Sequence, residues 1–258
     1  MADLFETETE LKIPENNNDE FNDSEKDLIN LFENKNWSLA KTNIENNKEI
    51  NIKKHSYKFL IEALDNGCDI DVILSLIKNG ADPKSMCKKM NSTVLHCAAE
   101  TGKLKIVEYL IDKCGCDPNA VCVLGFSPLH CCFEGDNIDV VHKLINSGAN
   151  VNAKSKTNLN VISQAVASGN IDMVALLEKN GADLFEICGV YGSALHNACR
   201  RNRRGKTKKM IEYLLERNFS FEEKDSEGKT AYQIAKFNHN DSALSVFDEV
   251  KKLNQNSR

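Results

Sequence analysis

Five segments of the chain recur at a nearly constant spacing, and this period constrains the fold more than any other feature of the sequence. Each segment opens with a small polar residue and continues with apolar or small residues. The steps between equivalent first positions are 34, 33, 33 and 37 residues, counted between Thr93, Ser127, Asn160, Ser193 and Thr230. Periods of this length are typical of solenoids, in which each repeat is one supersecondary unit.

A second apolar pattern follows each of the first four segments. It contains pairs separated by four residues, as in Ile106-Val107 with Leu110-Ile111, which place one apolar stripe on a helix. The opening Thr or Ser is predicted to cap the first helix, and Gly102 and Gly169 fit the left-handed conformation that ends one. Each unit is therefore predicted to be a helix-turn-helix pair, and such pairs must stack to bury their apolar faces.

Two motifs in the chain carry a family resemblance. Through Ser127-Pro128-Leu129-His130 and Gly148-Ala149-Asn150-Val151-Asn152-Ala153, the chain resembles the ankyrin repeat, strongly over about residues 56 to 250 and weakly from near residue 24. The resemblance implies an all-α solenoid of about seven stacked helix-turn-helix units with β-hairpin tips, the first and last units being atypical. We expect residues 1–23 to be a disordered acidic tail, residues 24–252 the repeat domain and residues 253–258 a polar tail.

Three histidines, His96, His130 and His196, occupy equivalent positions in their units. They could be metal ligands or bases, but the resemblance implies structural residues that hydrogen-bond one repeat to the next. Ten cysteines are expected to be free thiols, with Cys114 and Cys116 as candidates for a reactive thiol. The chain contains no Cys-x2-Cys pair, no phosphate-binding loop and no nucleophile elbow, so we predict no metal, no cofactor and no enzymatic activity.

Composition and charge narrow the class of protein. No apolar run approaches the length of a membrane span, and Met1 to Glu10 does not resemble a signal or transit peptide. We therefore expect a monomer in the cytoplasm, with the nucleus as the alternative compartment. The formal net charge of −5 disfavours a general nucleic-acid binder but permits a local basic patch.

Such a patch interrupts the repeat. The step from Ser193 to Thr230 is about four residues too long, and the excess lies between the two helices of that unit. The insertion carries seven basic residues in ten, namely Arg200, Arg201, Arg203, Arg204, Lys206, Lys208 and Lys209. It could be a solvated loop, a nuclear-import signal, or a site for an acidic protein, a nucleic acid or a phosphate-bearing ligand.

The resemblance places partner contacts on the inner helices and the hairpin tips. Two tips are unusually apolar, and exposed aromatic residues there are plausible binding anchors. We predict Phe126 and Tyr191 as anchors, with Glu100, Glu134 and Arg201 contributing from the inner helices; burial of Phe126 and Tyr191 would contradict the anchor hypothesis. The resemblance also marks Asn119 and Asn152 as candidates for asparaginyl hydroxylation.

Binding to another protein, as a scaffold, adaptor or inhibitor, is therefore the predicted function. One alternative is a nuclear regulator that masks a transcription factor. Another is a binder of a phosphate-bearing ligand or nucleic acid through residues 200–209, which steep salt dependence would reveal.

Overall fold

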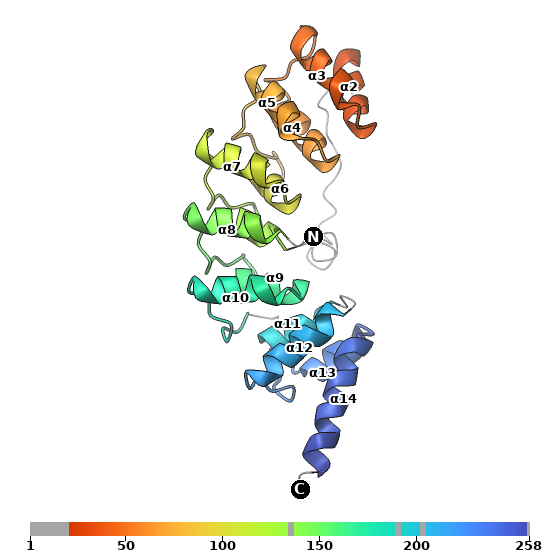
Figure 1. Ribbon diagram of the computed structural model, residues 1–258, viewed down its shortest axis with the longest axis vertical. Coiled ribbons are helices and arrows are strands. Elements are labelled where there is room, and N and C mark those ends of the chain that lie inside the picture. The colour runs from red at the N-terminus through yellow and green to blue at the C-terminus, as the bar shows by residue number, and fades with distance from the viewer. Residues whose placement is uncertain (1–20, 134–136, 189–191, 202–204, 257–258) are drawn as a thin grey trace.

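The computed structural model describes residues 21–133, 137–188, 192–201 and 205–256 (Figure 1). These residues form thirteen α-helices and one 3-10 helix, and they contain no β-strand. In chain order the helices are α2 (Asp23–Glu33), α3 (Trp37–Asn46), α4 (Ser56–Asp65), α5 (Ile70–Lys78), α6 (Val94–Glu100), α7 (Leu104–Asp112), η1 (Pro128–Cys131), α8 (Ile138–Asn146), α9 (Val161–Ser168), α10 (Ile171–Lys179), α11 (Ala194–Arg200), α12 (Lys206–Glu216), α13 (Ala231–Phe237) and α14 (Asp241–Asn256).

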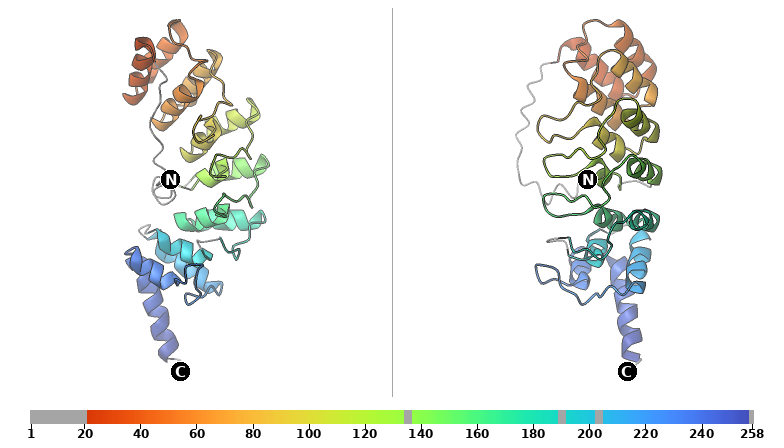
Figure 2. Two further views of the ribbon diagram at one scale, coloured as in Figure 1. Left: turned by 180° about the vertical axis from the view of Figure 1, so that it is seen from behind. Right: turned by 90° about the vertical axis from the view of Figure 1, so that its left-hand side faces the viewer.

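The helices form seven consecutive pairs that stack along the long axis of the molecule (Figure 1). The first helix of each pair, called the inner helix here, packs on the inner helices of neighbouring pairs: α2, α4, α6, η1, α9, α11 and α13 form this row. The second helices form an outer row, and the connecting loops project to the same side of the stack (Figure 2). The predicted all-α solenoid is confirmed.

The opening residue of each unit acts as a helix cap. The side chains of Thr93, Ser127, Ser193 and Thr230 each form a capping box with the fourth residue of the segment, and Asn160 Oδ1 accepts from Ser163 N at 3.0 Å. These contacts satisfy backbone N–H groups that a helix start leaves without partners. The recurring polar residue therefore fixes where the inner helices of the last five units begin.

The core lies between the two rows of helices and runs through the whole stack. In α7, Ile106, Val107 and Leu110 are buried, which is the apolar stripe that the sequence predicts. The same spacing buries Val140, Val141 and Leu144 in α8. Each unit thus buries its apolar faces against its neighbours as well as within itself.

The helical region is longer at both ends than predicted. Helix α2 begins at Asp23 with Asn22 as its cap, and the Phe21 ring lies 4.5 Å from the His55 ring. Residues 21–23 are therefore ordered, contrary to the boundary after residue 23. Helix α14 continues to Asn256, so the predicted tail from residue 253 is helical for its first four residues. The prediction of disorder for residues 1–20 lies outside the described part of the chain.

The loop tips are simpler than β-hairpins. Within the described residues they contain isolated antiparallel bridges, which pair Met86 with Thr93, Lys154 with Asn160, and Lys224 with Thr230. In these three loops a single bridge fixes the entry of the chain into the next inner helix without forming a strand.

Candidate partner-binding surface

Three imidazoles link consecutive units through their two ring nitrogens. The Nδ1 atoms of His96, His130 and His196 lie 2.8–2.9 Å from the opening Thr or Ser hydroxyl of their own units. Their Nε2 atoms lie 3.0 Å from Phe126 O, 3.3 Å from Leu159 O and 3.1 Å from Glu223 O, all of which belong to the loop before the next unit. The structural role that the family resemblance implied is confirmed.

Two of these imidazoles, His96 and His130, are poor bases because they are buried. Burial lowers the pKa of His130 to about 4, and it also lowers the pKa of His96. Both rings are therefore neutral at physiological pH, which suits a hydrogen-bonded link between repeats. Among the described residues no group of three or more His, Cys, Asp or Glu side chains is placed to hold a metal ion.

One loop position is exposed in each of the five loops between the second and the seventh units. It comes six residues after Gly80, Gly115, Gly148, Gly181 or Asn218, and it is occupied by Met86, Val121, Lys154, Ile187 and Lys224. Met86 is 50% exposed, Val121 59% and Ile187 58%, although all three are apolar. Because the units stack in register, these side chains form a row along the loop tips, called the loop row here.

Backbone and amide contacts hold neighbouring loops edge to edge. Val123 N donates to Met90 O at 2.7 Å, and Lys156 N donates to Leu124 O at 2.9 Å. Asn119 joins the next loop as well, since its Nδ2 donates to Gly148 O and its Oδ1 accepts from Asn150 N, both at 2.8 Å. The loop row is therefore a pre-formed surface.

Gly125 is expected to be essential to this edge contact. Its φ is +81°, and a Cβ there would lie 2.9 Å from Lys156 N. Gly125→Ala should therefore lose more stability than Gly148→Ala, where φ is +87° but no atom lies within 4 Å of the added Cβ. Left-handed strain alone costs roughly 1–2 kcal/mol. Urea denaturation measures the difference, and equal losses would contradict a clash between loops.

Phe126 is not an exposed anchor, and its prediction as one is wrong. The side chain is 5% exposed and packs with Cys122, Leu159 and Cys188, and its ring lies 5.4 Å from the His130 ring. Its carbonyl lies against His96 Nε2, so the inter-repeat link draws this end of the loop inward. Tyr191, the second predicted anchor, lies outside the described residues.

Other apolar side chains of the same two loops are exposed instead. Val123 is 39% exposed beside Val121, and Phe185 is 59% exposed beside Ile187. One face of Phe185 is covered, because its ring stacks on Phe219 at 4.7 Å. The apolar character that the sequence indicated in these loops therefore reaches the surface through residues other than the predicted pair.

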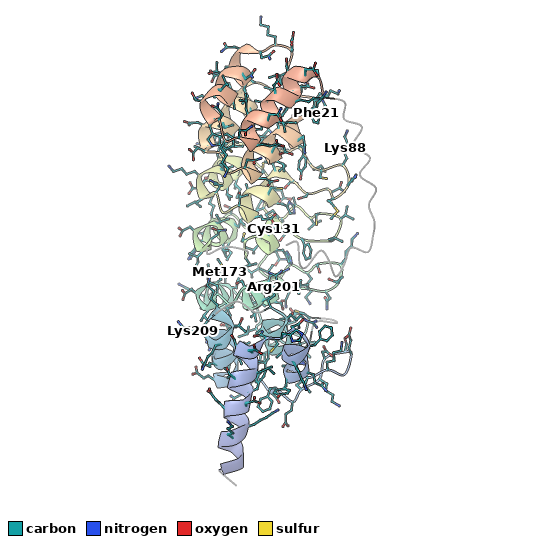
Figure 3. All side chains as sticks on the ribbon, turned by 90° about the vertical axis from the view of Figure 1, so that its right-hand side faces the viewer. Phe21, Lys88, Cys131, Met173, Arg201 and Lys209 are labelled. Atoms are coloured by element: carbon teal, nitrogen blue, oxygen red, sulfur yellow. The ribbon has the colours of Figure 1, made fainter. Side chains whose placement is uncertain are left out.

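Figure 3 shows the inner-helix face, where Cys131 and Arg201 lie along the row of inner helices and Lys88 lies in the loops beside it. Glu100 and Arg201 are partly exposed, and Glu134 lies outside the described residues. Their role in binding a partner stays a prediction.

The basic insertion is partly helical. Arg200 ends α11, while Lys206, Lys208 and Lys209 lie in the first turn and a half of α12, which has 11 residues where α7, α8 and α10 have nine. Lys206 and Lys209 are exposed and border a shallow pocket at the α9–α10 turn. Lys208 Nζ lies 3.9 Å from both Glu212 and Glu249. The loop interpretation therefore fails for Lys206–Lys209; Arg203 and Arg204 lie outside the described residues.

The ten cysteines are free thiols in the structure, and seven of them are buried. Burial raises the pKa of Cys116 to about 11 and also raises the pKa of Cys114. Both thiols hold their protons at neutral pH, so the hypothesis that they are reactive is not supported.

The two candidate asparagines have exposed side chains that are engaged between repeats. Asn152 Nδ2 donates to Gly181 O at 3.1 Å, as Asn119 Nδ2 does to Gly148 O. Their hydroxylation stays a prediction. The structure describes no helix that is both long and apolar enough to cross a membrane.

Comparison with known proteins supports the repeat assignment. Residues 33–155 match the family model for ankyrin repeats in three copies. The chain is 39% identical over 99 residues to alpha-latrocrustotoxin-Lt1a of Latrodectus tredecimguttatus, which covers 38% of this chain and 7% of the toxin. It is 35% identical over 92 residues to the B-cell lymphoma 3 protein homolog of Mus musculus, and the match covers 35% of this chain and 20% of that protein.

One relative carries the name of an enzyme. Palmitoyltransferase AKR1 of Lachancea kluyveri is 25% identical over 170 residues, covering 64% of this chain and 22% of that protein. The chain thus spans 7% to 22% of the length of these three relatives. Ankyrin repeats generally mediate contacts between proteins and are not themselves catalytic in most proteins that contain them.

Three observations indicate the same repeat: the family match over residues 33–155, the period of the remaining units, and the histidines that link one unit to the next. The chain contains ankyrin repeats.

Proposed function

We propose that the chain is a protein-binding scaffold or inhibitor that holds its partner on the loop row and the inner helices. The observation that carries this proposal is the exposure of Met86, Val121 and Ile187 at one register position. Large apolar side chains that are exposed together favour a protein contact, because covering them removes apolar area from water. The loops are also held to one another in advance, which lowers the entropy that binding must overcome.

Charged substitutions in the loop row test this function. We expect Val121→Asp with Ile187→Asp to weaken capture of partner proteins by roughly tenfold or more, because a buried unpaired carboxylate is costly in an interface. Partners are recovered with the intact chain from cell extract and quantified by mass spectrometry. Leu39→Asp is the matched control, since Leu39 is 50% exposed on α3, away from the loops.

The folded state should tolerate both changes, because the side chains are exposed; thermal unfolding checks this. Equal recovery of partners by the intact chain, the loop-row variant and the Leu39 variant would overturn the proposed surface.

A second candidate function, that of a nuclear regulator, is favoured by the exposure of Lys206 and Lys209 at the start of α12. A short exposed cluster of Lys and Arg suits recognition by an acidic import receptor. We expect Ala at Arg203, Arg204, Lys206 and Lys209 to abolish nuclear accumulation of a fluorescently tagged chain. Ala at Lys105 and Lys179, which lie on α7 and α10, is the control.

An unchanged distribution of the first variant would contradict nuclear import by this segment. Binding of a phosphate-bearing ligand or nucleic acid at the same residues would instead give an affinity that falls steeply with salt.

A further inference from the structure

The charge on the inner-helix face changes sign along the stack. Seven residues after the opening residue of each unit comes a position near the end of the inner helix, occupied by Glu100, Ala167, Arg200 and Phe237 in the described units. The helices α9, α11 and α13 pack consecutively, so equivalent positions of these units lie side by side. The row therefore starts with a carboxylate, passes through an uncharged residue, and ends with a cation and an aromatic ring.

Phe237 stands out at the end of this row. It is 83% exposed, more than any other large hydrophobic side chain of the described residues. Lys236 beside it is exposed, and Lys229 Nζ, which also pairs with Glu227 Oε2 at 2.7 Å, lies 6.0 Å from the centre of the Phe237 ring. An exposed aromatic ring among cations suits a partner that brings both an apolar side chain and negative charge.

The neighbouring arginines are held in place from beneath. Arg200 Nη2 lies 3.7 Å from Asp225 Oδ2, whose side chain is 1% exposed, while the Arg200 side chain remains 34% exposed. Asn240, which is fully buried, donates to Cys199 O at 3.3 Å and to Arg201 O at 3.1 Å. The end of α11 is thereby fixed against the α13–α14 turn, so the two arginines and Phe237 belong to one rigid surface.

Carboxylates occupy the other end of the same face. Asp65 is exposed at the end of α4, and Glu100 is partly exposed at the end of α6, the next inner helix. Between the two ends lies Ala167, which carries no charge. An acidic segment would be repelled by the first end and attracted by the second, so charge fixes where on the face it lies.

We propose that Arg200, Arg201, Lys236 and Phe237 bind an acidic peptide segment that carries one aromatic or aliphatic side chain. The cations pair with its carboxylates, and Phe237 packs on its apolar side chain. This inference rests on the proposed protein-binding function and names the class of its partner. A nucleic acid fits less well, because binding of a single strand relies on several aromatic side chains that stack successive bases, and this surface exposes one.

A synthetic peptide tests the assignment with the full-length chain. The probe is a fluorescein-labelled peptide of Asp and Glu with one central Phe, about ten residues long, which in extended form spans about three repeats. Its affinity is measured by fluorescence anisotropy. We expect Phe237→Ala to weaken binding of the peptide roughly tenfold, and Lys236→Glu to weaken it at least as much. A peptide with Ala in place of its Phe should bind to the intact chain about tenfold more weakly than the parent peptide does.

Lys105→Glu is the matched control, because it makes the same change of net charge on α7, away from this surface. It should leave the affinity unchanged. Thermal unfolding verifies that the Phe237 variant is folded, as expected for a side chain that is 83% exposed.

Three results would overturn the inference: no binding by the acidic peptide, equal binding by a peptide with Lys in place of Asp and Glu, or binding unaffected by Phe237→Ala. Tighter binding by a single-stranded oligonucleotide would reassign the surface to nucleic acid. None of these outcomes decides the proposed scaffold function, which the Val121 and Ile187 variants test on a different surface.

Discussion

Replacing His130 with Ala is expected to lower the free energy of unfolding by about 3 kcal/mol, because several buried polar groups lose their hydrogen-bond partner. The imidazole lies 3.1 Å from Ser127 N, 2.9 Å from Ser127 Oγ and 3.3 Å from Leu159 O, and both residues are buried. The change also leaves a cavity beside Phe126, whose ring contacts the imidazole. Urea denaturation monitored by circular dichroism measures the loss.

Two further variants make this prediction specific. His142→Ala removes an exposed histidine from α8 and should change stability by less than about 0.5 kcal/mol. His130→Gln should lose less than His130→Ala, because Gln233 occupies the equivalent position in the last unit, where its Oε1 accepts from Thr230 N at 2.9 Å. Equal stability of the His130→Ala variant and the intact chain would contradict a structural role for the link.

Acidification is expected to destabilise the protein through the same residue. Burial lowers the pKa of His130 to about 4, whereas an unfolded histidine has a pKa of about 6.5. Well above pH 6.5 the ring is neutral in both states, so its titration does not change the free energy of unfolding. As the pH falls from 6.5 toward 4, the unfolded chain binds a proton that the folded chain excludes, so stability falls by about 2 kcal/mol at pH 5.

The comparison with His130→Gln isolates this effect from the titration of carboxylates. Between about pH 7.5 and pH 5, the intact chain should lose about 2 kcal/mol more than the Gln variant. His96, whose pKa is also lowered by burial, contributes in both proteins and cancels from the difference. Parallel pH profiles for the two proteins would show that His130 is protonated in the folded state as readily as in the unfolded one.

The repeat could be predicted because each of its signals has a local physical cause. A hydroxyl at Thr93 or Ser127 caps the helix that starts directly after it, and the apolar stripe of α7 is made by residues four apart. Because each signal acts within a few residues, the sequence alone places these helices. The histidine links were expected only from the family resemblance. Their acceptors, such as Leu159 O for His130, lie about one repeat away in the chain, and local patterns do not identify such partners.

The loop residues show why the binding surface was predicted less well. Val121 and Phe126 belong to the same apolar loop, yet Val121 is 59% exposed and Phe126 is 5% exposed. The difference follows from the link between His96 and Phe126 O, a contact across 30 residues that orients one end of the loop inward. Size and hydrophobicity favoured Phe126, but tertiary contacts decided which side chain reaches the surface.

The even spacing of the loop row restricts the spacing of apolar residues in a partner that lies along it. Stacked units are about 10 Å apart, which is close to seven residues of an α-helix or three residues of an extended chain. Met86 and Val121 occupy consecutive positions of the loop row, and Lys154, which pairs with Glu186, occupies the next one. A partner that lies along the row should therefore carry apolar residues with a period of about seven if helical or three if extended, with a polar residue where Lys154 interrupts them.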